Sequence, residues 1–199
     1  YASMFGLNRP SGIEIPETTP ELTTEDPERS AMGQGTNSYS NVQLSRYVAA
    51  IANSGTVFDL SLLDKMTDSE GNLIKDFTPE ATGHVDIADS TWDAVHQGMR
   101  AVITDGSVSK IFKDLEVEIA GKTGTAQESR TRGNHAFFIS YGPYTNPEIC
   151  VTVNIPYGYS SSNAAMVAKN VYRFYYGYTD LESILGSGAL EVSNVKVGD

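Results

Sequence analysis

The sequence predicts an α+β protein in which helices pack on an antiparallel sheet. Residues 115–119 alternate apolar and acidic side chains with the period of two that is typical of a half-buried strand. Residues 135–141 and 149–156 are two strand-like runs that flank a turn rich in Gly, Pro and Asn, which favours a hairpin. A helical pattern over about 162–176 follows, and helices beside hairpin-connected strands define this fold class.

The composition is that of an ordinary globular chain. With 199 residues, 40% hydrophobic and 20% charged, it can bury the core of one domain. Its net charge of −11 disfavours nucleic acid or an anionic membrane as a partner. No run approaches the ~18 apolar residues of a membrane span, and the chain begins at Tyr1 as if within an element, so we expect a piece of a longer protein. The single cysteine, Cys150, lies in a strand-like run and is interpreted as buried rather than as a nucleophile.

The first part of the chain predicts a loop-rich lead-in over residues 1–38, followed by a helix. Four prolines between residues 6 and 38 exclude long helices there. The helix is predicted over 41–53, because apolar residues recur at three- and four-residue steps and Asn53-Ser54-Gly55 provides a glycine stop.

Helices and one hairpin are expected over the whole segment 39–114. Two short strand-like runs between residues 57 and 74 surround a polar turn and predict the hairpin. A second helix is predicted from Ser90, where Ser90-Thr91-Trp92-Asp93 resembles a capping box, to a stop at Asp105-Gly106.

Residues 115–176 are predicted to form the strand that leads into Lys122-Thr123-Gly124, a polar loop, the second hairpin and the closing helix. The tail, 177–199, is less patterned and is expected to be loosely held. The closing helix is predicted to pack through Ala165, Met166, Val167, Val171, Phe174 and Tyr175.

The stretch after the predicted strand has the residue types that bind an acyl substrate. Alternation places Thr123 and Thr125 on one face of a strand, so that two hydroxyls can converge on one carboxylate, and directs Lys122 to the opposite side. Gly124 lets a ligand backbone approach closely. The alternative is an edge strand that a solvated lysine protects from aggregation.

Several stretches together match one family in register. They are Phe5–Pro16, Gly33–Gly35, Val42–Leu44, Ile51–Gly55, Gly121–Gln127, His135–Phe138 and Pro147–Ile149. Over about residues 1–176 the chain resembles the C-terminal half of the transpeptidase domain of a class B penicillin-binding protein, and the cell-elongation type most of all. Ala126 supports class B, because class A enzymes more often have a second threonine there.

The resemblance implies a partial penicillin-binding, β-lactamase-like fold and a peptidoglycan D,D-transpeptidase acting at the extracytoplasmic face of a bacterial membrane. Stem peptides ending in D-Ala-D-Ala and β-lactams are the implied ligands. The implied enzyme is anchored through an N-terminal segment not present here, and a wall-synthesis complex is a further implied partner. It assigns Lys122 to the catalytic centre and Thr123, Gly124 and Thr125 to substrate binding, with the Thr125 N–H in an oxyanion hole. No cofactor or metal is implied.

The family's nucleophilic Ser-x-x-Lys and its Ser-x-Asn lie upstream of the matching part, so this chain alone is expected to be inactive. A β-lactam sensor or an inactive structural homologue is therefore an alternative. A β-lactamase is a third hypothesis, but nothing here supplies its deacylating base.

Other candidate residues favour structural roles. Ser107-Val108-Ser109-Lys110 matches Ser-x-x-Lys but follows a helix stop, which predicts a connector. Ser38–Asn41 and Ser161–Asn163 precede helices and are interpreted as caps. His135 is predicted to be structural at a strand start, His84 and His96 lack metal-ligand spacing, and Gln127 is a weak candidate for lining the cleft.

Overall fold

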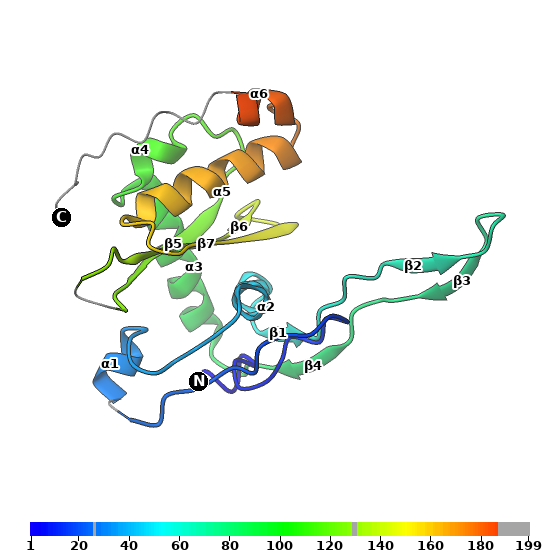
Figure 1. The fold of residues 1–199 in the computed structure, drawn as a ribbon, viewed down its shortest axis with the longest axis horizontal. Coiled ribbons are helices and arrows are strands. Elements are labelled where there is room, and N and C mark those ends of the chain that lie inside the picture. Colours follow the sequence, from blue (N-terminus) through cyan, green and yellow to red (C-terminus); the bar gives the residue numbers. More distant parts are fainter. Residues whose placement is uncertain (26, 129–130, 187–199) are drawn as a thin grey trace.

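The computed structural model describes residues 1–25, 27–128 and 131–186. A body of sheet and helices forms one end of the molecule, and a long two-stranded arm projects from it (Figure 1). No helix within the described ranges is long and apolar enough to cross a membrane. The elements are α1 Pro27–Ala31, α2 Asn41–Ala52, β1 Thr56–Phe58, β2 Lys65–Thr67, β3 Leu73–Asp76, β4 Ala81–His84, α3 Asp89–Thr104, α4 Ser109–Phe112, β5 Ala120–Ala126, β6 His135–Gly142, β7 Ile149–Ile155, α5 Ser161–Tyr175 and α6 Leu181–Gly186.

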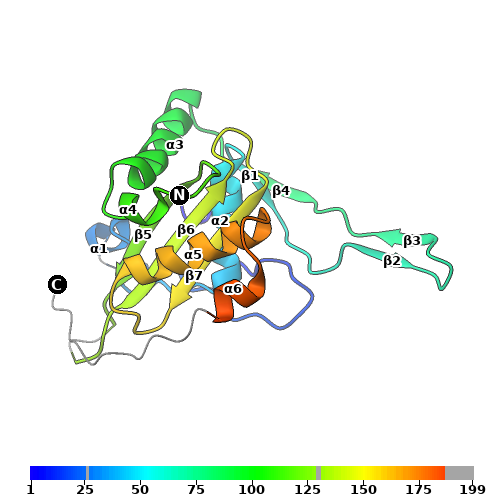
Figure 2. The ribbon, with the colours of Figure 1, turned by 90° about the horizontal axis from the view of Figure 1, so that it is seen from above.

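The body is built on an antiparallel sheet in the order β5-β6-β7. Helix α5 covers one face of this sheet and α2 the other, while α3 runs beside β5 (Figures 1 and 2). The α+β class, the hairpin formed by β6 and β7, and the helix that follows it are confirmed. The prediction of a strand over residues 115–119 was wrong, because this segment is irregular and β5 begins at Ala120.

The irregular segment keeps the predicted alternation of burial without strand pairing. Ile119 is fully buried and Glu118 is exposed. Arg100 on α3 donates to the Ile119 carbonyl at 2.8 Å and to the Glu118 carboxylate at 2.7 Å. The Glu118 carbonyl also accepts from the Tyr144 backbone N–H at 2.7 Å, so the segment is held by α3 and by the turn between β6 and β7 rather than by a neighbouring strand.

The face of the sheet below α5 forms the larger core. Fully buried Phe138 stacks on Phe112 of α4 with ring centroids 5.4 Å apart, and Ala164, Ala165 and Ala168 let α5 approach the sheet closely. The predicted packing stripe of α5 was largely wrong, since only Ala165 of it is buried. The three alanines make the close contact instead, and the Tyr172 side chain is buried in the same cluster. The exposed members of the predicted stripe are Met166, Val167, Val171, Phe174 and Tyr175.

The opposite face packs on α2 and α3. Val48 and Ile51 of α2 meet Met99 of α3 and Tyr141 of the sheet in one buried cluster. The predicted helix over 41–53 is confirmed, and Ser40 caps it in a full capping box with Gln43.

The capping box predicted at Ser90 was wrong. Helix α3 begins at Asp89 after Ala88, which makes no side-chain cap bond. Instead, the negative charge of Asp89 in the first turn interacts favourably with the positive end of the helix dipole.

The arm is the predicted hairpin of β2 and β3, with Met66 opposite Lys75. The sequence did not reveal that Thr56–Phe58 belongs to a different pair: β1 pairs with β4 at the base of the arm, with Val57 opposite Gly83. All residues of β2, β3 and β4 are exposed, so the strands lack the buried face that makes alternation visible in a sequence.

Buried polar contacts fix the lead-in to α2. The Arg46 guanidinium donates to the carbonyls of Gly6, Arg9 and Pro10. The Glu17 carboxylate accepts from the Ser40 hydroxyl at 2.6 Å. Within residues 1–25 and 27–38, the short α1 is the only helix, as the prolines predicted. In the tail, α6 was not predicted, and residues 187–199 lie outside the described residues.

Candidate active-site groove

The Lys-Thr-Gly stretch lies on β5, an edge strand of the sheet within the described residues. Thr123 pairs with Phe138 and Thr125 with Ala136, two residues that are fully buried under α5. Lys122 pairs with Ile139, on the face toward α2. Since paired residues of an antiparallel sheet share a face, the register gives the predicted arrangement, with both threonines on one side and the lysine on the other.

The backbone of this strand presents hydrogen-bonding groups to its open edge. The Thr123 carbonyl accepts from the Lys122 ammonium at 2.8 Å, and the Thr125 carbonyl accepts from the Gln34 amide at 3.5 Å. Both acceptors therefore point away from β6. Alternation in an antiparallel ladder directs the N–H groups of the same two residues outward as well, so an extended ligand can pair with this edge.

A groove of about 620 Å³ runs along the edge. The predicted site residues Lys122, Thr123, Gly124 and Thr125 all line it, as do Gln127 and His135. A Cβ on Gly124 would lie 3.2 Å from the Phe137 Cβ and would narrow the groove. The opposite wall is the loop Met32–Tyr39, which was not predicted to be a binding surface. Its Gly33-Gln34-Gly35 was noted only as part of the family resemblance.

Polar contacts fix one end of the groove, where the β5–β6 connection begins. The His135 ring Nε2 lies 3.1 Å from the Glu128 carboxylate, which also accepts from the Tyr157 hydroxyl at 3.2 Å. The hydrogen bond with His135 holds the pKa of Glu128 below its usual value. The Tyr157 backbone N–H donates to the other ring nitrogen of His135 at 3.3 Å. These contacts hold the His135 ring at the start of β6, which agrees with its predicted structural role.

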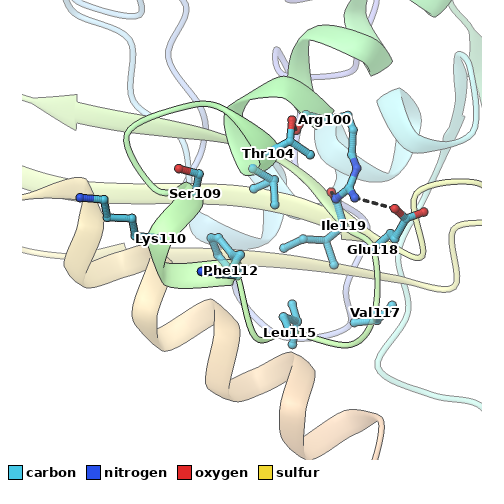
Figure 3. A pocket seen from close by; sticks show the side chains of 11 residues that line it. Arg100, Thr104, Ser109, Lys110, Phe112, Leu115, Val117, Glu118 and Ile119 are labelled. Atoms are coloured by element: carbon cyan, nitrogen blue, oxygen red, sulfur yellow. Dashed lines mark hydrogen bonds and ion pairs between the residues drawn. The ribbon is translucent and has the colours of Figure 1, made fainter.

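A second pocket, of about 490 Å³, lies between α3, α4 and the segment before β5 (Figure 3). Two of its charged groups, Arg100 and Glu118, are bonded to each other, and Lys110 points away from the other labelled residues. Phe112 and Ile119 within it are core residues that are almost fully buried. The groove along β5 is therefore the stronger candidate for a site.

The remaining serine and histidine candidates have structural positions. Ser107 lies in the connector between α3 and α4, as predicted. A second Ser-x-x-Lys, at residues 193–196, lies outside the described residues. Ser40 is a helix cap, but the cap of α5 is Ser160 rather than a member of Ser161–Asn163. The His96 ring contacts the Ile51 carbonyl at 2.8 Å.

Two further expectations concern metals and the cysteine. Within residues 1–25, 27–128 and 131–186, no cluster of three or more His, Cys, Asp or Glu side chains could hold a metal ion. Cys150 lies on β7, and burial raises the pKa of its thiol to about 11. A thiol with so high a pKa is a poor nucleophile near neutral pH, which agrees with its structural interpretation.

Comparison with known proteins identifies the family. The penicillin binding protein transpeptidase domain matches residues 1–173. Penicillin-binding protein 2B of Streptococcus pneumoniae is 29% identical over 193 residues, which is 87% of this chain and 28% of that protein. The peptidoglycan D,D-transpeptidase MrdA of Haemophilus influenzae is 29% identical over 206 residues, covering 86% of this chain and 31% of the relative.

Two solved structures have the same fold as this chain. The structure of penicillin-binding protein 2B superposes with a TM-score of 0.77 at 26% identity, over 90% of this chain and 32% of that one. Penicillin-binding protein A of Mycobacterium tuberculosis, solved as an imipenem acyl-enzyme complex, has the same fold with a TM-score of 0.74 at 21% identity, over 85% of this chain and 39% of that one. The chain thus belongs to the penicillin-binding protein transpeptidase domain family. It spans about a third of the length of the relatives it matches.

Proposed function

We propose that the complete protein containing this chain is a serine-type D,D-transpeptidase that cross-links peptidoglycan. The observation that carries the proposal is the Lys-Thr-Gly-Thr stretch on a sheet edge, lining a groove, in a chain of this family. Such an edge suits a peptide that ends in a carboxylate. The peptide backbone can add to the sheet as a further strand, and hydroxyl donors can bind its terminal charge.

Each residue has a separate role in this proposal. Thr123 and Thr125 donate from their hydroxyls to the carboxylate of the substrate or of a β-lactam. The outward N–H of Thr125 stabilises the oxyanion that forms on the attacked carbonyl. Lys122, which lines the groove from the face opposite the threonines, supplies positive potential. Gly124 leaves room for the ligand backbone, because a Cβ there would project toward Phe137.

The attacking serine is proposed to come from the part of the protein that precedes this chain. Its Oγ attacks the carbonyl carbon of the penultimate D-alanine, the peptide C–N bond breaks, and terminal D-alanine leaves as the free amine. A neighbouring amine then attacks the ester, forms the cross-link and returns the serine hydroxyl. The names of the relatives, one of them a peptidoglycan D,D-transpeptidase and the others penicillin-binding proteins, support this reaction.

The location and the biological role are inferred from the same relatives. A substrate in the wall requires an enzyme at the extracytoplasmic face of a bacterial membrane, and an elongation role is proposed from the likeness to MrdA. The proposed ligands are stem peptides ending in D-Ala-D-Ala and the β-lactams that resemble them. A β-lactam-bound relative supports the latter.

Acylation of the complete protein by a labelled penicillin tests the function. Lys122→Ala should slow the chemical step, because it removes positive potential near the reacting groups. Thr125→Val keeps the shape and the backbone N–H but deletes a hydrogen bond to a charged group, worth about 1.5–3 kcal/mol. Its effect should shrink for an analogue that lacks the free carboxylate, whereas the effect of Lys122→Ala should persist.

Matched controls lie outside the groove. Lys110→Ala and Thr104→Val change the same residue types at exposed positions of α4 and α3. Neither control should alter acylation. If both groove variants remain folded and react at the wild-type rate, β5 is only a protected edge. If the wild-type protein binds a penicillin without acylation, the sensor alternative replaces the enzyme.

A further inference from the structure

The loop opposite β5 is built to present one side chain to the groove. Gln34 lies between Gly33, with φ +76°, and Gly35, with φ +96°, a conformation that favours glycine on both sides. Its backbone is held from both directions. The Gln34 N–H donates to the Arg29 carbonyl at 2.9 Å, and the Asn37 side-chain amide donates to the Gln34 carbonyl at 3.2 Å. These contacts fix the backbone of Gln34, and its side chain extends from this backbone toward β5.

The Gln34 side chain reaches across the groove to the strand edge. Its Nε2 lies 3.5 Å from the Thr125 carbonyl oxygen, and both residues line the groove. The contact is at the long end of the range for a hydrogen bond, so a ligand can replace it at small cost. This carbonyl is the acceptor that a backbone N–H of an added strand would use. The glutamine amide thus occupies the place of a peptide N–H.

We propose that Gln34 is a substrate-positioning residue that recognises the backbone amide of an extended acyl chain bound along β5. The ligand N–H takes the Thr125 carbonyl, and the released carboxamide bonds to the ligand from the opposite wall. A carboxamide has both a donor and an acceptor, which matches the two groups of a peptide bond. The ligand class is therefore an acylamino compound, either a peptide or a β-lactam with an amide side chain. This inference rests on the proposed acyl-transfer function.

The choice of ligand tests this role in the complete protein. Benzylpenicillin has an acylamino side chain, whereas 6-aminopenicillanic acid has a bare amine in its place and the same ring and carboxylate. Gln34→Ala should lower the second-order acylation constant for benzylpenicillin about three- to tenfold, the range of one neutral hydrogen bond. The constant for 6-aminopenicillanic acid should change less than twofold. The loss should appear in the dissociation constant of the initial complex rather than in the rate of the chemical step.

Two further variants control this measurement. Gln97→Ala removes the same side chain from an exposed position on α3, outside the groove, and should leave both constants unchanged. Gln34→Glu keeps the shape but loses the amide donor, so it should show the same preference between the two ligands and remains informative if Gln34→Ala fails to fold.

The outcomes separate this inference from the function on which it rests. An equal loss for both ligands, or no loss at all, would overturn the positioning role. Faster acylation of Gln34→Ala would overturn it too, because the Gln34 amide would then only compete with the ligand for the Thr125 carbonyl. In these cases the transpeptidase proposal stands. If the wild-type protein is not acylated by benzylpenicillin, the proposed function fails and the role of Gln34 fails with it.

Discussion

Arg46→Met should destabilise the fold far more than any exposed charge deletion. The Arg46 side chain is 1% exposed and forms an ion pair with Asp59 at 3.4 Å, in addition to its bonds with the lead-in. It donates to the Arg9 carbonyl at 2.9 Å and to the Pro10 carbonyl at 2.7 Å, and it also binds the Gly6 carbonyl. Methionine keeps most of the apolar stem but leaves the carbonyls of Arg9 and Pro10 without their Arg46 donor, whereas the Gly6 carbonyl still accepts from the Arg9 N–H at 3.3 Å.

The expected cost follows from what remains unpaired. A buried acceptor without a partner costs about 1–3 kcal/mol, and Asp59, at 39% exposed, can be hydrated again. Partial entry of water at the carbonyls of Arg9 and Pro10 lowers the sum of the two costs, so the free energy of unfolding should fall by about 3 kcal/mol. That is a large share of the roughly 5–15 kcal/mol available to a domain.

Urea unfolding measures this loss, with Trp92 as a suitable probe because it is buried beside Phe5 of the lead-in, with ring centroids 6.2 Å apart. The midpoint should fall by about 1.5 M for a slope near 2 kcal/mol/M. Arg9→Met is the control: it removes the 2.7 Å ion pair with the same Asp59, but its side chain is 38% exposed and its loss should cost less than about 1 kcal/mol. Equal midpoints for the two variants would refute the view that buried carbonyls dominate.

The remaining predictions concern the Ser107 connector, Cys150 and Tyr172. The 199-residue chain alone should form no stable adduct with a labelled penicillin by intact mass, and Ser107→Ala should leave acylation of the complete protein unchanged; an adduct mapped to Ser107 would contradict the connector assignment. Because burial raises the pKa of Cys150 to about 11, alkylation of its thiol at pH 8 should be about 100-fold slower in the folded than in the unfolded chain. The rate for the folded chain should rise with pH, and equal rates for the folded and unfolded chains would disprove this prediction. Tyr172→Phe removes a buried hydrogen bond from the Tyr172 hydroxyl to the Ser140 hydroxyl at 3.0 Å and should lower the free energy of unfolding by about 1 kcal/mol, whereas no change in the unfolding midpoint would show that the bond is energetically neutral.

Features that depend on a local residue pattern could be predicted from the sequence. The helix at 41–53, the hairpin of β6 and β7 and the fold class could be predicted, because each has a buried face that repeats with a fixed period. The opposite faces of Lys122 and Thr123 also followed from the strand period alone. The family was predicted from short stretches distributed along the chain, and the match of the transpeptidase domain family to residues 1–173 confirms this prediction.

Contacts between residues far apart in the sequence could not be predicted and emerge only in the folded chain. The loop with Gln34 lies 91 residues before Thr125, and no local pattern brings a glutamine to a strand edge. The irregular segment before β5 shows the same limit. Its alternation is real, but Arg100 of α3 takes the Ile119 carbonyl that a strand partner would need. Periodicity reports which side of a segment is buried, whereas the partner of each backbone group depends on elements distant in the sequence.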